Sequence, residues 1–140
     1  MKKSKLEIEY SFDFELVGII SVAKGYKLAW ELNQSLAINL VKQPDLVVGF
    51  KKGEEKSFSF YAHETSLNRL KLFKNKPIDN EPGKYFLIPE FPHFDFIILA
   101  AMEERYAHQR LLELIKSIPS VQLVAPIPLD GLRSKSNFIF

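Results

Sequence analysis

Two short segments carry apolar side chains on both faces of an extended chain, and they constrain the fold more than any other feature. They are LVGII at residues 16–20 and FIILAA at residues 96–101. A strand that is apolar on both sides is typical of a sheet whose two faces are both covered. We therefore predict that these two segments run through the interior of a fold that contains a sheet.

The rest of the chain changes between the period of strands and the period of helices. The segment KLEIEYSFDFEL (residues 5–16) has an apolar side chain at every even position, which predicts a strand with one face in water. Apolar residues recur at steps of three and four over residues 25–40 and 103–118, which predicts two helices. Further strands are predicted over DLVVGF, KSFSFYAH, NRLKLFKNK and VQLVAPI.

The order of these elements predicts the fold class. Most connections between successive strands are short, and short connections require antiparallel pairing. Two helices that cover one face of such a sheet give an α+β fold. Because the chain has 140 residues and no linker-like segment, we expect a single α+β domain over residues 1–140.

Composition argues against several classes of function. There is no cysteine, which excludes disulfides, thiolate nucleophiles and cysteine-ligated metals. Nineteen basic residues against seventeen acidic ones give a net charge of +2, whereas nucleic-acid-binding proteins usually concentrate basic charge. The longest apolar runs are far shorter than the roughly twenty residues of a membrane span. We expect a cytoplasmic protein without a membrane partner, and no pattern indicates a cofactor or a metal.

Three residues of the first predicted helix have two possible interpretations. Tyr26, Trp30 and Asn33 follow one another at helical steps beside the leucine stripe. They either face a ligand or belong to a wide buried stripe in which Asn33 bonds to a neighbouring backbone group. Large aromatic rings at helical spacing usually bury their area, which favours the buried stripe.

The end of the chain is apolar. It finishes on Phe138, Ile139 and Phe140. Exposing these side chains to water is costly, so we expect the tail to dock on the body of the protein or on a second copy. Phe138 and Phe140 are therefore candidates for self-association, and a homodimer is one predicted state.

Three ionisable residues lie beside the second apolar segment. Glu90, His93 and Asp95 follow or flank prolines in IPEFPHFD, which predicts an irregular extended link before the strand. In a catalytic interpretation, Asp95 orients His93 as a general base or metal ligand, and Glu90 completes the set. In a structural interpretation, the carboxylates accept backbone N–H groups where the strand begins. The structural one is favoured because no second cluster of histidines or carboxylates has to join them.

The segment NRLKLFKNK is the most basic part of the chain. In a weak nucleic-acid-binding surface, Arg69, Lys71, Lys74 and Lys76 would contact phosphates and Phe73 would stack on a base. A solvated strand face, or an edge strand that its lysines protect from further pairing, explains the same residues and is favoured.

The segment IPEFPHFDF resembles the motif that gives the IPExxxVDY family of small bacterial proteins its name. Ile88, Pro89, Glu90 and Asp95 match the motif directly, and two phenylalanines replace its valine and tyrosine. The segments LVGIIS and YKLAWELN also look similar to that family. The resemblance implies no catalytic residues, because the family has no assigned activity. Phe96 lacks the tyrosine hydroxyl, which puts any mechanism that needs this group in doubt.

These observations together predict a non-catalytic domain that binds a protein partner or a second copy of itself. A metal-assisted or acid–base enzyme that uses Glu90, His93 and Asp95 is the first alternative. A weak nucleic-acid binder is the second.

Overall fold

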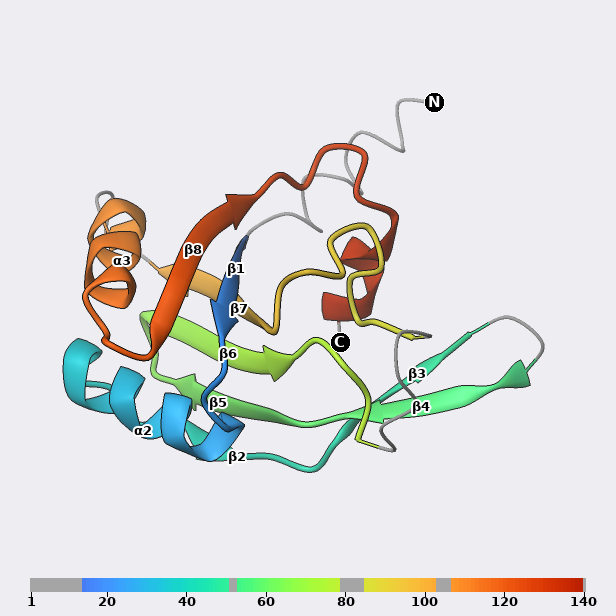
Figure 1. Ribbon diagram of the computed structural model, residues 1–140, viewed down its shortest axis with the longest axis horizontal. Helices are drawn as coiled ribbons and strands as arrows, with labels where there is room; N and C mark the ends of the chain where they lie inside the picture. The colour runs from blue at the N-terminus through green and yellow to red at the C-terminus, as the bar shows by residue number, and fades with distance from the viewer. Residues whose placement is uncertain (1–13, 51–52, 79–84, 103–106, 140) are drawn as a thin grey trace.

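The computed structural model describes residues 14–50, 53–78, 85–102 and 107–139. A six-stranded sheet with the order β2-β5-β6-β7-β1-β8 forms its centre (Figure 1), and every neighbouring pair is antiparallel. Its strands are β1 (Glu15–Ser21), β2 (Val41–Lys42), β5 (Phe60–Glu64), β6 (Asn68–Lys74), β7 (Phe96–Met102) and β8 (Val121–Ile127). The other elements are the paired strands β3 (Leu46–Gly49) and β4 (Glu55–Phe58), helices α2 (Gly25–Leu36) and α3 (Ala107–Lys116), and the 3-10 helix η2 (Arg133–Phe138).

Two helices pack on one face of the central sheet, as predicted, and the fold class is α+β. Helix α2 buries Leu28, Ala29 and Leu32, which lie at the spacing of one helical face. Leu111 and Ile115 of α3 join the same core cluster. The strands contribute their alternate residues to this cluster.

The opposite face of the sheet is covered largely without helix, which the sequence patterns did not predict. The cover consists of the segment 85–95, the C-terminal segment with η2, and the β3–β4 pair, all on the other side of the sheet from α2 and α3 (Figure 1). Leu87, Ile88, Phe94 and Phe138 are buried in this second core cluster. The two apolar segments found in the sequence are explained by this double cover, because β1 and β7 are interior strands with a core on each side.

Two details differ from the sequence predictions. The segment KSFSFYAH forms two strands in different sheets, with Ser59 as the residue between β4 and β5. The carbonyl of Ser59 accepts the N–H of Lys74 at 3.0 Å. Strand alternation from Phe94 onward predicts that Phe94 and Phe96 share one face. Phe94 instead joins the second core, whereas Phe96 lies on the helix-covered face, since the regular strand begins only at Phe96. Most of the alternating segment at residues 5–16 lies outside the described residues.

The basic segment is also placed differently from either prediction. Strand β6 lies between β5 and β7, so it is neither a sheet edge nor a solvated face. The ring of Phe73 is fully buried and stacks on Phe60 with 5.0 Å between ring centroids. Phe73 therefore cannot stack on a base, and this part of the nucleic-acid hypothesis is wrong. Lys71 is nearly buried, whereas Lys74 and Lys76 are exposed.

Across the described ranges, no helix combines the length and the apolar character that crossing a membrane requires.

Candidate functional site

A buried asparagine organises the segment that carries the three ionisable residues. Asn75 follows β6 directly, is fully buried, and takes part in five hydrogen bonds with the segment 87–95. Its side-chain amide donates to the carbonyls of Phe91 (3.2 Å) and Phe94 (2.9 Å), and its Oδ1 accepts the N–H of Ile88 at 2.8 Å. A segment without regular structure has no ladder to satisfy its backbone groups, and Asn75 replaces that ladder.

Asp95 connects the end of this segment to β1. Its N–H donates to the carbonyl of Ile19 at 2.8 Å, and its Oδ2 accepts the N–H of Ser21 at 3.0 Å. The register of β1 against β8 shifts between Ile20 and Ser21, so the carboxylate accepts a backbone N–H at an irregular point of the ladder. This is the type of contact that the structural interpretation of Asp95 predicts.

Glu90 binds the start of the C-terminal 3-10 helix, which lies more than forty residues later in the chain. Its Oε2 accepts the backbone N–H groups of Arg133 (2.8 Å) and Ser134 (3.1 Å), and its Oε1 accepts the hydroxyl of Ser134 at 2.7 Å. These N–H groups begin η2 and have no partner inside the helix, so Glu90 acts as a cap supplied by another segment. Asn137 adds a hydrogen bond from its side-chain amide to the carbonyl of Leu87 at 2.9 Å.

The capping contacts of Glu90 predict a pH dependence of stability. Partial burial acts to raise the pKa of this carboxyl, but hydrogen bonds from Ser134 and Arg133 outweigh it and lower the pKa below its usual range. A group whose pKa is lower in the folded state stabilises the fold above its unfolded pKa of about 4.3. That stabilisation is lost as the pH falls through the lower, folded-state pKa.

We therefore expect Glu90→Gln to lower the free energy of unfolding at pH 7 by about 1 kcal/mol, a typical value for a lost cap. The difference from the parent protein should shrink below pH 4, where the parent also loses the charge. Urea unfolding between pH 3 and pH 7 measures this difference. The matched control is Glu113→Gln, at an exposed position of α3. Equal losses at all pH values would contradict the assignment, as would unchanged hydrogen exchange at the amides of Arg133 and Ser134.

The structure does not assemble the predicted catalytic set. The carboxylates of Glu90 and Asp95 accept hydrogen bonds from two different parts of the chain, at Arg133–Ser134 and at Ser21. His93 is exposed, and its ring lies against Phe94 with 4.4 Å between centroids. Among the residues that the structure describes, no group of three or more histidine, aspartate or glutamate side chains is arranged to hold a metal ion.

The two aromatic residues of α2 are exposed, so the predicted wide buried stripe is wrong for them. The exposed fraction is 68% for Tyr26 and 60% for Trp30, and Val22, just before the helix, is 85% exposed. Asn33 does bond to a neighbouring backbone group, as predicted. Its Oδ1 accepts the N–H of Leu40 at 2.7 Å, and its amide donates to the carbonyl of the same residue at 3.4 Å.

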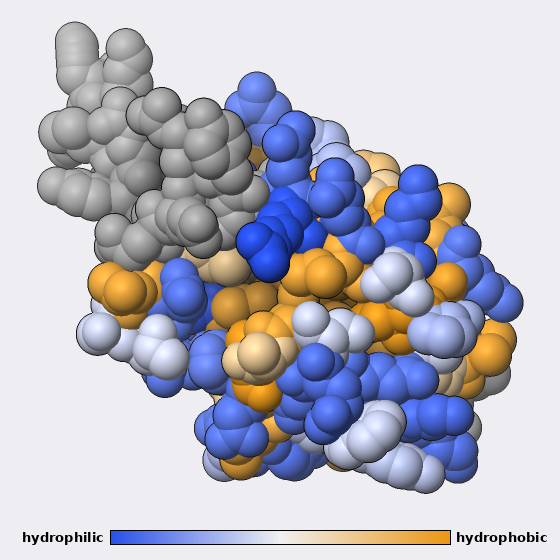
Figure 2. Space-filling model, turned by 90° about the vertical axis from the view of Figure 1, so that its left-hand side faces the viewer, coloured by the Kyte–Doolittle hydropathy of each residue, from blue (hydrophilic) through white to orange (hydrophobic). Residues whose placement is uncertain are grey.

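We call Val22, Tyr26 and Trp30 the α2 surface. Tyr26 and Trp30 lie one helical turn apart, on the side of α2 that faces away from the buried Leu28 and Leu32. Lys24, two residues before Tyr26, and Lys27, directly after it, are both exposed. Figure 2 views the side of the molecule that carries α2 and α3, and it shows apolar side chains gathered between hydrophilic ones there.

The C-terminal aromatic residue that the structure describes belongs to the core. Phe138 is buried, and its ring meets that of Phe73 edge-on with 5.1 Å between centroids. Phe138 therefore docks on the body of the same chain, and its ring is not available to a second copy. Phe140, the other residue predicted for self-association, lies outside the described residues.

Sequence reasoning missed Asn75 and Ser134, the two polar residues that fix the segment and the C-terminal helix. Asn75 stands among lysines in a basic segment, and Ser134 stands in a short polar stretch, so neither position carries a pattern. A comparison with models of protein families found no match, and a search of curated proteins found none.

Proposed function

We propose that this chain is a non-catalytic binding domain that recognises a protein partner through the α2 surface. The observation that carries the proposal is the exposure of Tyr26 and Trp30 one turn apart on a helix whose other face is fully buried. Tyrosine and tryptophan dominate the energetically important residues of protein interfaces. A water-exposed pair of this kind gives up a large apolar area when a partner covers it.

The charge around the two rings specifies the chemistry of the partner. Lys27 follows Tyr26 directly, Lys24 lies two residues before it, and both are exposed. Glu31 is partly buried and accepts a hydrogen bond from the Ser120 hydroxyl. Positive charge at the edge of an apolar contact favours partners with complementary negative charge. The proposed partner therefore presents apolar side chains that are flanked by glutamate or aspartate.

Membership of the IPExxxVDY family is part of this proposal. The residues that match the motif have roles within the chain, since Ile88 is buried, Glu90 caps η2 and Asp95 bonds to Ser21. Such roles support an interpretation of the motif as a signature of the fold. The enzyme alternative has less support, because Glu90 and Asp95 already accept hydrogen bonds from separate segments.

The test uses a dye-labelled synthetic helical peptide with leucine at the i, i+3, i+4 and i+7 positions and glutamate at the others. We expect saturable binding by fluorescence polarisation, and a loss of at least about tenfold in affinity for Tyr26→Ala and for Trp30→Ala. Ser35→Ala, at another exposed position of α2, is the matched control. The double variant Lys24→Glu, Lys27→Glu should bind the acidic peptide more weakly. It should bind a version of the peptide with lysine in place of glutamate more tightly.

Two outcomes would count against this function. Binding that survives both ring substitutions would place the contact elsewhere on the protein. Sedimentation of the chain alone tests for self-association. If the chain self-associates and Trp30→Ala abolishes this, the partner of the α2 surface is a second copy and not an acidic protein.

A further inference from the structure

A cavity of about 670 Å³ opens at the β2 edge of the central sheet, and no residue of the α2 surface lines it. The sizes of the side chains on β5 and β6 explain why this space is open. Ala62 of β5 stands directly opposite Lys71 of β6, whereas the next pair on this face, Phe60 and Phe73, fills its space with two stacked rings. The small side chain of Ala62 leaves room, and β2 is too short to close it, because only Val41 and Lys42 pair with β5.

The lining of the cavity combines one lysine, one glutamate, one histidine, two side-chain amides and an apolar wall. Lys71 is only 9% exposed yet lines the cavity, and Glu64 supplies a carboxylate two residues beyond Ala62. The apolar wall comes from Val41 and Phe60. Because the two formal charges cancel, the lining selects neither a simple anion nor a simple cation. It fits a ligand with both charges and a short apolar group.

The environment of Lys71 strengthens this complementarity. Burial lowers the pKa of Lys71 from its usual range, the negative charge of Glu64 opposes that shift, and the positive charge of Arg69 adds to it. A partly buried ammonium group gains more from a negative ligand group than a fully exposed one does, because less water screens the interaction. A ligand carboxylate at Lys71 would therefore be favoured.

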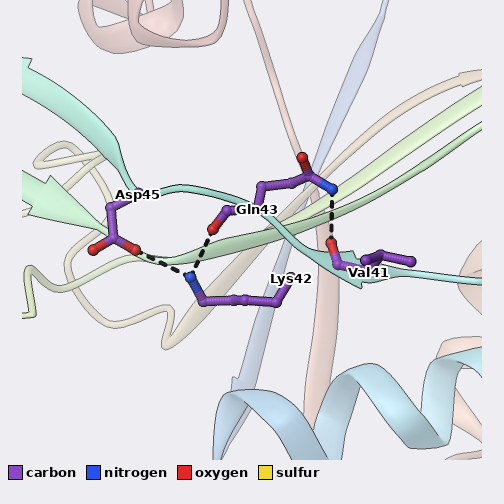
Figure 3. A network of polar contacts seen from close by, with 4 residues as sticks. All are labelled: Val41, Lys42, Gln43 and Asp45. Atoms are coloured by element: carbon purple, nitrogen blue, oxygen red, sulfur yellow. Dashed lines mark hydrogen bonds and ion pairs between the residues drawn. The ribbon is translucent and has the colours of Figure 1, made fainter.

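One side of the cavity is held in place by a local network of hydrogen bonds (Figure 3). The Nε2 of Gln43, which lines the cavity, donates to the carbonyl of Val41 at 3.0 Å. The ammonium of Lys42 bridges the carbonyl of Gln43 (2.7 Å) and the carboxylate of Asp45 (3.1 Å). A wall that is already ordered loses less entropy when a ligand binds.

We propose that this cavity binds a small zwitterion with an apolar side chain, of which an apolar α-amino acid is the simplest. The ligand carboxylate lies at Lys71, its ammonium group lies at Glu64, and its side chain contacts Phe60 and Val41. This site is separate from the α2 surface, so it stands whether or not that surface binds a protein.

Isothermal titration calorimetry on the full chain tests the proposal with L-leucine and L-phenylalanine as probes. We expect saturable binding of at least one of them. For leucine, the matched half-ligands are 4-methylpentanoate, which lacks the ammonium group, and 3-methylbutylamine, which lacks the carboxylate. Each half-ligand should bind at least about tenfold more weakly, because each makes only one of the two charge interactions that the amino acid would make.

Three substitutions separate the contributions of charge and space. Lys71→Met keeps the volume of a nearly buried side chain and removes the charge, and Glu64→Gln removes the opposite charge. Ala62→Phe fills the cavity while both charges stay. All three should reduce leucine or phenylalanine affinity at least about tenfold, and circular dichroism checks that each variant is folded.

Several results would overturn the proposal. Absence of saturable binding of both amino acids in the millimolar range would remove it. Binding that persists in Ala62→Phe would place the amino acid outside the cavity. A half-ligand that binds as tightly as leucine would refute recognition of both charges. Variants on the α2 surface serve as a further control, since Trp30→Ala should leave amino-acid binding unchanged even if it abolishes binding of the acidic peptide.

Discussion

Asn75→Ala should lower the free energy of unfolding by roughly 3–5 kcal/mol. The side chain is fully buried, and both its amide hydrogens and its carbonyl oxygen are used. Truncation leaves the carbonyl of Phe94 and the N–H of Ile88 without their partner, and each unsatisfied buried group costs about 1–3 kcal/mol. The carbonyl of Phe91 loses one hydrogen bond but still accepts the N–H of Phe94 at 3.3 Å. Urea unfolding followed by circular dichroism measures the loss.

Two matched substitutions distinguish this mechanism from a simple loss of volume. Asn33→Ala removes the same amide from a half-buried position with two hydrogen bonds to one residue, so it should cost only about 1–2 kcal/mol. Asn75→Asp keeps the shape but replaces the donor nitrogen with an oxygen that faces two carbonyls. Burial and these carbonyls should raise the pKa of the new carboxyl, so the variant should be least stable at neutral pH and recover as the pH falls. Equal losses for Asn75→Ala and Asn33→Ala would contradict the assignment.

The sequence predicts the regular elements of this fold because periodicity records which side of an element is buried. The strand VQLVAPI was predicted at its observed bounds for this reason, and helix α3 (Ala107–Lys116) lies within the helix predicted over residues 103–118. The cover of the second sheet face could not be predicted. Besides the β3–β4 pair, this cover consists of an irregular segment and a short 3-10 helix, which Asn75 and Glu90 hold through contacts between residues far apart in the chain. Such contacts leave no local pattern.

Contacts between distant residues also limited the prediction of the candidate sites. Glu90 and Asp95 were correctly singled out as unusual, but their partners, Ser134 and Ser21, are distant in sequence and ordinary in type. Tyr26 and Trp30 were assigned to a buried stripe because spacing alone does not say how wide the buried face of a helix is. The buried face of α2 is narrow, with Leu28, Ala29 and Leu32, and it leaves both rings in water.

Gly18→Ala should destabilise the protein by about 3 kcal/mol, near the upper end of the usual cost of overpacking. Gly18 lies on β1 under the ring of Phe94, and a Cβ atom at this position would stand 2.4 Å from the Cδ2 of that ring. The ring cannot move away freely, because it is buried and because Asn75 holds the Phe94 carbonyl. Gly49→Ala is the matched control, since its Cβ would meet no atom within 4 Å, and its effect should stay within about 0.5 kcal/mol.

A double-mutant cycle identifies the ring of Phe94 as the cause of the Gly18 effect. Phe94→Ala alone should cost about 3–5 kcal/mol, because it empties a buried site. In that background Gly18→Ala should cost little, since the added methyl group then enters the vacated space, and the two substitutions should show a coupling of at least about 2 kcal/mol. Additive losses would mean that the backbone of β1, and not the ring above it, requires glycine. The segment 85–95 would then depend on Asn75 and Asp95 for its position over the sheet, with no steric requirement at Gly18.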